Sequence, residues 1–380
     1  MPSQLLHILF GEDVVAEISR RLGIDPGGPD SPPQSQRGIM AGNAFDTIRD
    51  THKKAFTLGC QGPDIFYHSQ SRRPVGLEYG TLLHRRGTGT FTAELLKMGL
   101  GWGSRRGRDA QKEKGINALG AYALGYMTHA ILDRQAPPYI VYKSDRPPPE
   151  TPRRDRSHAF LERIIDLLMY RYLRGSEISG WDQEDMLAEI CDNPPPGLKE
   201  LLLHSLVRTF PERAGRDLKL SSRIENTFLD CAFFYRYTAP ALTTISFFQA
   251  KVTNKIPPGV VTGSFVAYLY PEDLPETIDF LNLKKRPWYY PAGDSKEDTR
   301  SFPEIYTDAV NAAASSLGHI IGKYLEEGKF PIREAARVIG NSGLSIVDGA
   351  GKPCVPTRSD PFPLQEILDR QVEMRGVTQP

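Results

Sequence analysis

The sequence predicts an all-α protein: one principal helical domain with a helical extension towards its C-terminal end. Two observations predict this fold class. Apolar residues recur at spacings of three and four over many segments, as they do along one face of a helix. Prolines and glycines gather between those segments, where they favour loops, and the only candidates for extended strands are short stretches near residues 259–270.

Helical patterns follow one another along the chain. They cover residues 2–22, 43–57, 76–99 (with a break around Gly87 and Gly89), 115–135, 157–173, 183–192, 197–208, 218–250, 302–326 and 331–341. Residues 24–40, 104–114 and 144–156 are predicted loops, and the stretch GCQGPD, which ends at Asp64, is a predicted tight turn. We expect a helical domain over 1–250, a loop and helical extension packed on it over 251–345, and a tail over 346–380.

Composition excludes several classes of protein. The 380 residues include 47 Lys and Arg against 46 Asp and Glu, a balance that gives no overall attraction to nucleic acid. The four cysteines are widely spaced, which argues against both a disulfide framework and a cysteine zinc site. The first residues lack the basic region and cleavage site of a secretory signal, and no apolar run approaches a membrane span. We therefore expect a cytoplasmic protein without a transmembrane segment.

Two histidines each have a carboxylate four residues later on a predicted helix. The pairs are His129 with Asp133 and His158 with Glu162. Residues at this spacing share one face of a helix, so each pair can bind one ion. The spacing alone also fits an ordinary surface ion pair.

The surroundings of these residues favour a metal site. His129 and Asp133 lie in the apolar segment ALGYMTHAILD, where burial of polar groups costs free energy unless they are paired or bound to a metal. Asp64 lies on the GCQGPD turn, His84 follows two leucines, and His7 stands between Leu6 and Ile8. A single polynuclear site explains all of them together. Oxygen and nitrogen ligands without a thiolate suit zinc, and they are also compatible with manganese or iron.

The ordered series His7, GPD with Asp64, His84, GYMTHAILD and His158-x-x-x-Glu162 resembles the zinc-dependent phospholipase C family. The single-strand-specific zinc nucleases share the helical fold and ligand set of that family. The resemblance covers roughly residues 1–170, with a weaker likeness at RPWYYP (286–291).

This resemblance implies a role for each matched residue. The first zinc would be bound by Asp64, His84, His129 and Asp133. A second zinc would be bound by His158 and Glu162, and a third by His7 with a bridging Asp133. The implied activity is hydrolysis of a phosphate ester, with a phospholipid as substrate, metal-bound hydroxide attacking phosphorus and Asp64 acting as general base.

The chain departs from the family at two positions. The secreted members bind the third ion through a mature N-terminal Trp, whereas this chain starts MPSQ. The family also has a His shortly after the helix Asp, where this chain has Ala136. His68, one helical turn past Asp64, could substitute for one missing ligand. Two alternatives therefore stay open: a nuclease or phosphatase on the same fold, and a degenerate metal-binding scaffold without catalysis. The sequence does not specify the headgroup or the oligomeric state.

Overall fold

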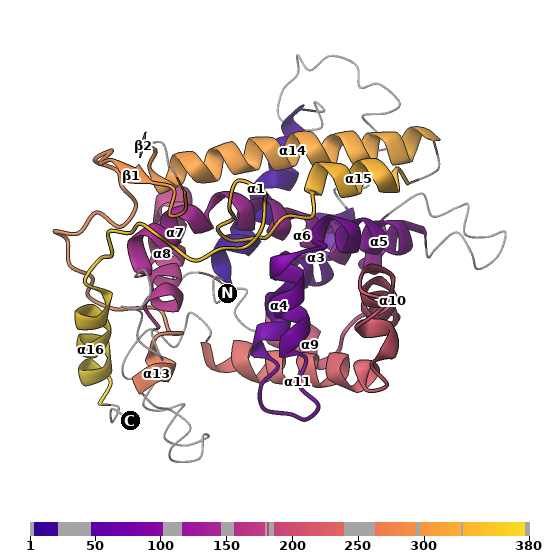
Figure 1. Cartoon of the computed structure of the whole chain (residues 1–380), viewed down its shortest axis with the longest axis horizontal. Helices are drawn as coiled ribbons and strands as arrows, with labels where there is room; N and C mark the ends of the chain where they lie inside the picture. The colour runs from indigo at the N-terminus through magenta and orange to yellow at the C-terminus, as the bar shows by residue number, and fades with distance from the viewer. Residues whose placement is uncertain are drawn as a thin grey trace.

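The structure is a computed structural model that describes residues 4–21, 47–101, 116–145, 156–178, 181, 186–238, 263–293, 297–327 and 330–376. These residues are mostly helical (Figure 1), so the predicted all-α class is confirmed. Among them, no helix combines the length and the apolar composition that crossing a bilayer requires. The loops predicted at 24–40 and 104–114 lie outside the described residues.

The elements follow the predicted order with shifted ends. The first part of the chain forms α1 (Leu5–Arg21), η1 (Thr47–Thr51), α3 (Lys53–Cys60), η2 (Gly62–His68), α4 (Leu77–Arg85), α5 (Thr88–Gly101), α6 (Ala118–Gln135), α7 (Pro137–Ser144) and α8 (Ser157–Arg174). The remainder forms α9 (Met186–Asp192), α10 (Leu198–Thr209), η5 (Ala214–Arg216), α11 (Leu220–Thr238), α13 (Gly263–Val266), β1 (Trp288–Tyr289), β2 (Glu297–Asp298), α14 (Phe302–Glu327), α15 (Ile332–Ile339) and α16 (Leu364–Met374).

The central helix is α6, and its small residues let neighbouring helices approach closely. The helix starts where the Asn117 side chain accepts a hydrogen bond from the Gly120 amide, and most of its residues are buried. It packs against α1, α3, α5 and α14. At the crossing with α3, a Cβ added to Gly125 would lie 2.3 Å from the Phe56 carbonyl oxygen, and one added to Gly59 would lie 2.1 Å from the Tyr122 carbonyl oxygen. The crossing therefore requires glycine on both helices.

The first turn of α1 is held by a side chain from α8. Asp166 is fully buried, and its carboxylate accepts hydrogen bonds from the backbone amides of Gln4, Leu5 and Leu6 at 3.1, 3.2 and 2.9 Å. These are amides at a helix start that have no partner within the helix. The contact fixes the start of α1, and with it the position of His7.

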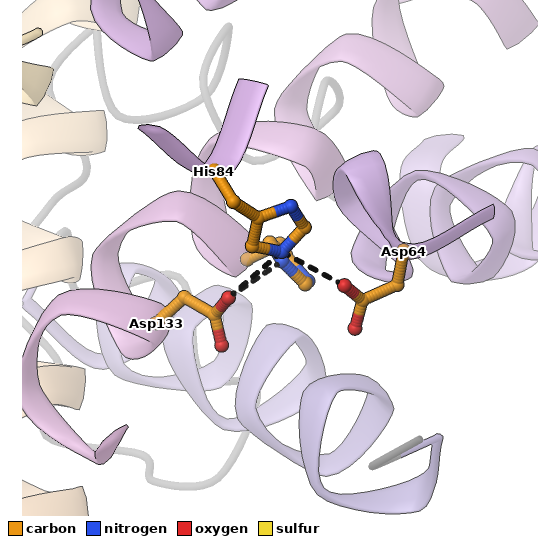
Figure 2. Close-up of side chains that lie close together, drawn as sticks. Asp64, His84 and Asp133 are labelled. Carbon is orange, nitrogen blue, oxygen red and sulfur yellow. Dashed lines mark ion pairs between the residues drawn. The ribbon is translucent and has the colours of Figure 1, made fainter. Parts of the chain in front are cut away.

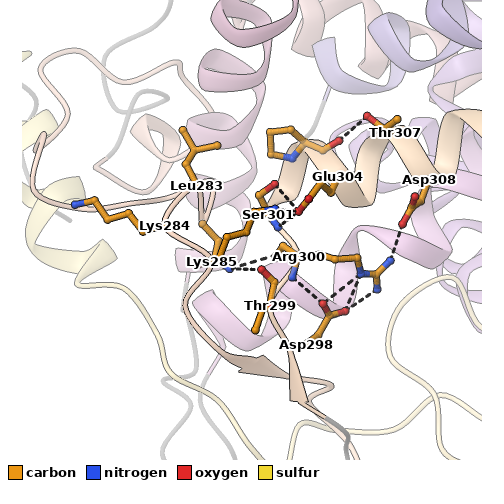
Figure 3. A network of polar contacts seen from close by, with 12 residues as sticks. Leu283, Lys284, Lys285, Asp298, Thr299, Arg300, Ser301, Glu304, Thr307 and Asp308 are labelled. Atoms are coloured by element: carbon orange, nitrogen blue, oxygen red, sulfur yellow. Dashed lines mark hydrogen bonds and ion pairs between the residues drawn. The ribbon is translucent and has the colours of Figure 1, made fainter.

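The long helix α14 brings the C-terminal part of the chain onto the core. It packs against α1 and α6, and Figure 1 shows it lying across the same side of the molecule as α15. At its start, Ser301 donates from its amide and its hydroxyl to the Glu304 carboxylate, at 2.8 and 3.0 Å (Figure 3). Arg300 bridges Asp298 and Asp308 beside this cap. Strand β2, which pairs antiparallel with β1, and the start of α14 are thus joined into one polar cluster.

Two local predictions were wrong in the described residues, and two helix boundaries have local physical causes. Residues 263–270 contain the short helix α13 instead of a strand, since a short apolar run does not by itself distinguish the two. The predicted tail contains α16, whose buried residues Leu364, Ile367, Leu368 and Val372 follow helical spacing. Helix α3 continues through Gly59 to Cys60 because the glycine lies at the crossing with α6. A second helix, α7, follows α6 directly. It begins with two prolines, which the first positions of a helix accept because amides there have no partner within the helix.

The crossing of α3 and α6 gives a stability prediction. We expect Gly125→Ala to lower the free energy of unfolding by about 1–3 kcal/mol, because the new methyl group would press on the α3 backbone. The measurement is chemical unfolding followed by circular dichroism. Gly318→Ala is the matched control, since Gly318 lies within α14 with nothing within 4 Å of an added Cβ. Gly318→Ala should be unchanged or more stable by about 0.5–1 kcal/mol. An equal loss of unfolding free energy in the two variants would contradict the role of Gly125 in packing.

Candidate metal centre

Four buried side chains meet in the interior of the helical domain. Asp64 comes from η2, His84 from α4, and His129 and Asp133 from α6, and one ligand atom of each lies within 4.8 Å of the others. Figure 2 shows His84 between the two carboxylates, with the two ion pairs drawn. His84 is the most exposed of the four at 8%. The sequence analysis predicted all four as ligands of one ion, and the structure brings them together.

The separations between these atoms suit a small tetrahedral ion. Nε2 of His84 lies 2.9 Å from Asp64 Oδ1 and 3.5 Å from Asp133 Oδ2, and Nε2 of His129 lies 3.2 Å from Asp133 Oδ2. Zinc binds nitrogen and oxygen at about 2.0–2.1 Å, so two ligand atoms at tetrahedral angles stand roughly 3.3 Å apart. Of the three separations, two are shorter than this value and one is longer.

Both imidazole rings are turned so that Nε2 faces the carboxylates. The Gly80 carbonyl lies 2.8 Å from Nδ1 of His84, and the Cys60 carbonyl lies 3.1 Å from Nδ1 of His129. A carbonyl oxygen can only accept a hydrogen bond, so each Nδ1 carries a hydrogen, and each Nε2 offers a lone pair when the ring is neutral, which is the state that binds a metal. Backbone contacts of this kind are how proteins orient histidine ligands of metals.

Several atoms of the cluster lack a hydrogen bond, which is the second sign of a metal. In the described part of the chain, Nε2 of His84, Nε2 of His129 and Oδ2 of Asp133 are buried and make no hydrogen bond of acceptable geometry. Buried polar atoms are rarely left without a partner, and each one costs free energy. With both histidines neutral, the two aspartates leave a charge of about −2 in the interior, which one divalent cation would neutralise. The residues present therefore fit a metal ion.

The turn before η2 fits closely around the His129 ring. Gly62 adopts φ +55°, and a Cβ added there would lie 2.3 Å from the ring carbons. Only glycine accepts both the backbone conformation and the contact. The predicted tight turn thus has two functions here: it ends α3 and it brings Asp64 to within reach of α6.

His7 extends the cluster from the side of α1. Its Nε2 lies 3.4 Å from Oδ1 of Asp133, and its ring stacks on that of His129 with centroids 4.0 Å apart. The two oxygens of Asp133 therefore face different histidines, Oδ2 towards His84 and His129 and Oδ1 towards His7. A carboxylate in this position can bridge two ions, as the sequence analysis expected of it.

A half-buried His158 and a buried Glu162 form a separate pair on α8. His158 Nε2 lies 3.3 Å from Glu162 Oε1, and in the described residues neither Nε2 nor Glu162 Oε2 makes a hydrogen bond. On the other side of the ring, Nδ1 lies 3.0 Å from Asp145 Oδ1, which also accepts from the Ser144 hydroxyl at 2.6 Å. Asp145 thus orients the His158 ring through Nδ1, the nitrogen that faces away from Glu162. A carboxylate commonly orients a metal-binding histidine in this way.

Burial and mutual charge set the pKa values of these groups. Burial works to lower the pKa of His84, but contacts with Asp133 and Asp64 outweigh it and raise the pKa to about 9. Burial also works to raise the pKa of Asp133, yet the adjacent histidines hold that pKa well below its usual range. Burial raises the pKa of Glu162, although the neighbouring His158 works to lower it.

The structure assigns other surroundings to two residues that the sequence analysis considered. The His68 ring stacks on Phe234 with centroids 3.8 Å apart, and burial lowers its pKa to about 3. It therefore packs against aromatic residues, and it is not part of the four-residue cluster. Ala136 is buried at the end of α6, where it caps the helix and supplies no ligand atom.

Two residues of the site were missed by the sequence analysis. Asp145 is 13 positions from His158, so no helical spacing relates them, and the contact arises only when α7 and α8 pack together. Tyr67 lies half-buried with its ring 4.7 Å from that of His84. It follows Asp64 within η2, and the sequence carries no signal that separates it from the other aromatic residues.

No protein family model, curated protein or solved structure matches the chain. The resemblance to the zinc-dependent phospholipase C family therefore remains a prediction from the motif residues.

The raised pKa of His84 predicts how the stability of the metal-free protein depends on pH. Because the folded pKa of about 9 lies above the ordinary 6.5, the proton on His84 stabilises the fold fully below pH 6.5. This contribution, roughly 3 kcal/mol, is lost as the pH rises to 9. Thermal unfolding of metal-free protein should show this loss between pH 6.5 and 9, and His84→Gln should reduce it. An unchanged pH dependence in the variant would contradict the assignment.

Proposed function

We propose that this chain is a metal-dependent hydrolase of phosphate esters that binds two or three zinc ions. The observation that supports it best is the convergence of His84 Nε2 and His129 Nε2 on the carboxylates of Asp64 and Asp133 in a buried site. Oxygen and nitrogen ligands without a thiolate fit zinc, and manganese and iron accept the same set. A phospholipid is the substrate class that the resemblance implies.

Each residue of the cluster would have a defined task. Zinc supplies the chemistry by lowering the pKa of a bound water and by balancing negative charge on a phosphate. Asp64 lies in the first turn of η2 and offers a carboxylate that can take a proton from the attacking water. The carbonyls of Gly80 and Cys60 hold the two rings in the orientation that zinc requires. Asp133 would contribute Oδ2 on the side of His84 and His129 and Oδ1 on the side of His7.

The pairs around the main cluster would complete a polynuclear site. His158 and Glu162 would bind a second ion, oriented by Asp145, and His7 would bind a third with Asp133. Neighbouring metal ions a few ångströms apart can stabilise both the attacking and the leaving oxygen of a phosphate ester. The presence of these further ligand-type residues supports a hydrolase more strongly than the four-residue cluster does alone.

A non-catalytic scaffold is the second candidate. The four protein ligands Asp64, His84, His129 and Asp133 form a closed set, and structural zinc sites are closed whereas catalytic ones keep a position open. The absence of a ligand at Ala136 also favours this alternative. A single structural ion would, however, leave the pair of His158 and Glu162 without a role. A nuclease or phosphatase on the same fold would share the metal chemistry and differ only in the groups that recognise the substrate.

Substitution of Asp64 tests the hydrolase directly. Asp64→Asn keeps the size of the side chain and removes its charge, so we expect hydrolysis to fall by roughly a hundred- to ten-thousand-fold. The assay would use zinc-loaded protein with a chromogenic phosphodiester, phosphatidylcholine in mixed micelles, single-stranded DNA and a phosphomonoester. Treatment with a chelator should abolish the activity, and zinc should restore it.

His204→Gln is the matched control, because His204 lies on α10 outside the cluster and should leave hydrolysis unchanged. Zinc-loaded wild-type protein with no activity on any of these substrates would favour the scaffold. Activity confined to DNA or to the monoester would favour the nuclease or the phosphatase.

A further inference from the structure

The chain that follows α15 is bonded to both of the helix ends that present metal ligands. Residues 340–344, which we call the strap, leave α15 and run across the ends of α4 and α6 (Figure 1). Arg134, the residue after Asp133, donates from Nη2 to the Gly340 carbonyl at 2.7 Å and more weakly to that of Ser342 at 3.4 Å. The Leu344 amide donates to the carbonyl of His84 at 2.8 Å. Two metal ligands are thus joined through a segment far away in sequence.

The strap is also fastened between these two points. The Gly87 amide donates to the Asn341 carbonyl at 3.3 Å. The Thr90 amide donates to the Asn341 side-chain oxygen at 2.9 Å, and the Asn341 side-chain nitrogen donates to the Thr90 hydroxyl at 3.1 Å. These bonds hold the strap against the junction of α4 and α5, three to six residues after His84.

The contact between Arg134 and the strap is closely fitted. Gly340 adopts φ +75°, and a Cβ added there would lie 3.2 Å from Nη1 of Arg134. A residue other than glycine would be strained in this backbone conformation and would press on the guanidinium. The close fit places the planar Arg134 head group directly on the carbonyl that it binds.

We propose that Arg134 and the strap are positioning elements of the metal centre. They hold the His84 end of α4 at a set distance from the Asp133 end of α6. Helix α4 packs mainly on η2 and α5, whereas α6 packs on α3 and α5, so the strap supplies a direct tie between the two ligand-bearing ends. Arg134 acts through Asp133 and His84 and does not bind the metal itself. The inference rests on the proposed metal centre and extends it to the C-terminal part of the chain.

Zinc affinity of the full chain, measured by competition with a chromophoric chelator, tests this role. We expect Arg134→Met to weaken zinc binding by about 10- to 100-fold, the range that changes behind metal ligands commonly cause. Asn341→Ala releases the strap without touching Arg134 or His84, and it should weaken binding in the same direction by a smaller factor. Arg337→Met is the control, because Arg337 is exposed on α15 and its loss removes the same charge.

Two further readouts separate positioning from general stability. The melting temperature of each metal-free variant should stay close to that of the wild type, and Arg134→Lys should recover part of the affinity because lysine can still donate to Gly340. The visible absorption of cobalt-substituted protein should change in Arg134→Met, since it reports the coordination geometry. Wild-type protein that binds zinc, with unchanged affinity in Arg134→Met and Asn341→Ala, would overturn this inference alone. Wild-type protein that binds no zinc would overturn the proposed function and this inference with it.

Discussion

Two carboxylates, Asp64 and Asp133, are buried in the apolar interior of the helical domain, and the rest of the site is arranged around their charge. Both side chains are almost completely buried. An isolated charge in such a place costs several kcal/mol, so the fold has to bring positive or polarisable groups to it. His84 and His129 supply their Nε2 atoms at 2.9 and 3.2 Å, and Nε2 of His7 lies 3.4 Å from the other oxygen of Asp133. A divalent cation would complete the compensation that the histidines begin.

The geometry of the centre depends on contacts that contain no ligand atom. Gly125 and Gly59 let α3 and α6 touch, and Gly62 then turns the chain so that Asp64 faces His129. The Asp166 carboxylate fixes the start of α1 and places His7. These glycines and the buried Asp166 carboxylate thus position the site as directly as the carbonyls that orient the imidazole rings. Because these contacts come from different parts of the sequence, the centre forms only when the whole helical domain is folded.

Much of this arrangement could be predicted from the sequence, and the exceptions have physical causes. The helices and the pairs His129–Asp133 and His158–Glu162 follow from local spacing, which helical geometry fixes. The sequence also identified Asp64, His84 and His7, because each stands among apolar or turn residues where a polar group is costly. Asp145 is brought to His158 only by the packing of α7 on α8. His68, which the sequence left open as a substitute ligand, packs on aromatic side chains that α11 contributes, a contact that only the fold creates.

The hydrolase and the scaffold make different demands on the same residues. A scaffold needs one ion in the closed cluster, whereas a phosphate-ester hydrolase needs the α8 pair and His7 as well. Figure 2 shows only the surroundings of Asp64 and Asp133; His7 approaches Asp133 from α1, and the pair of His158 and Glu162 lies on α8. The number of metal ions per chain is therefore the quantity that separates the two accounts.

The most direct test is the metal content per chain, measured by plasma mass spectrometry on protein purified without a metal-affinity tag. The account predicts two or three zinc ions in the wild type, fewer in His129→Ala, and the loss of one ion in Glu162→Gln with the main cluster still occupied. One ion per chain, unaffected by Glu162→Gln, would leave the scaffold as the better description. A folded, stable chain that carries no metal would contradict the central claim and return these histidines to structural roles.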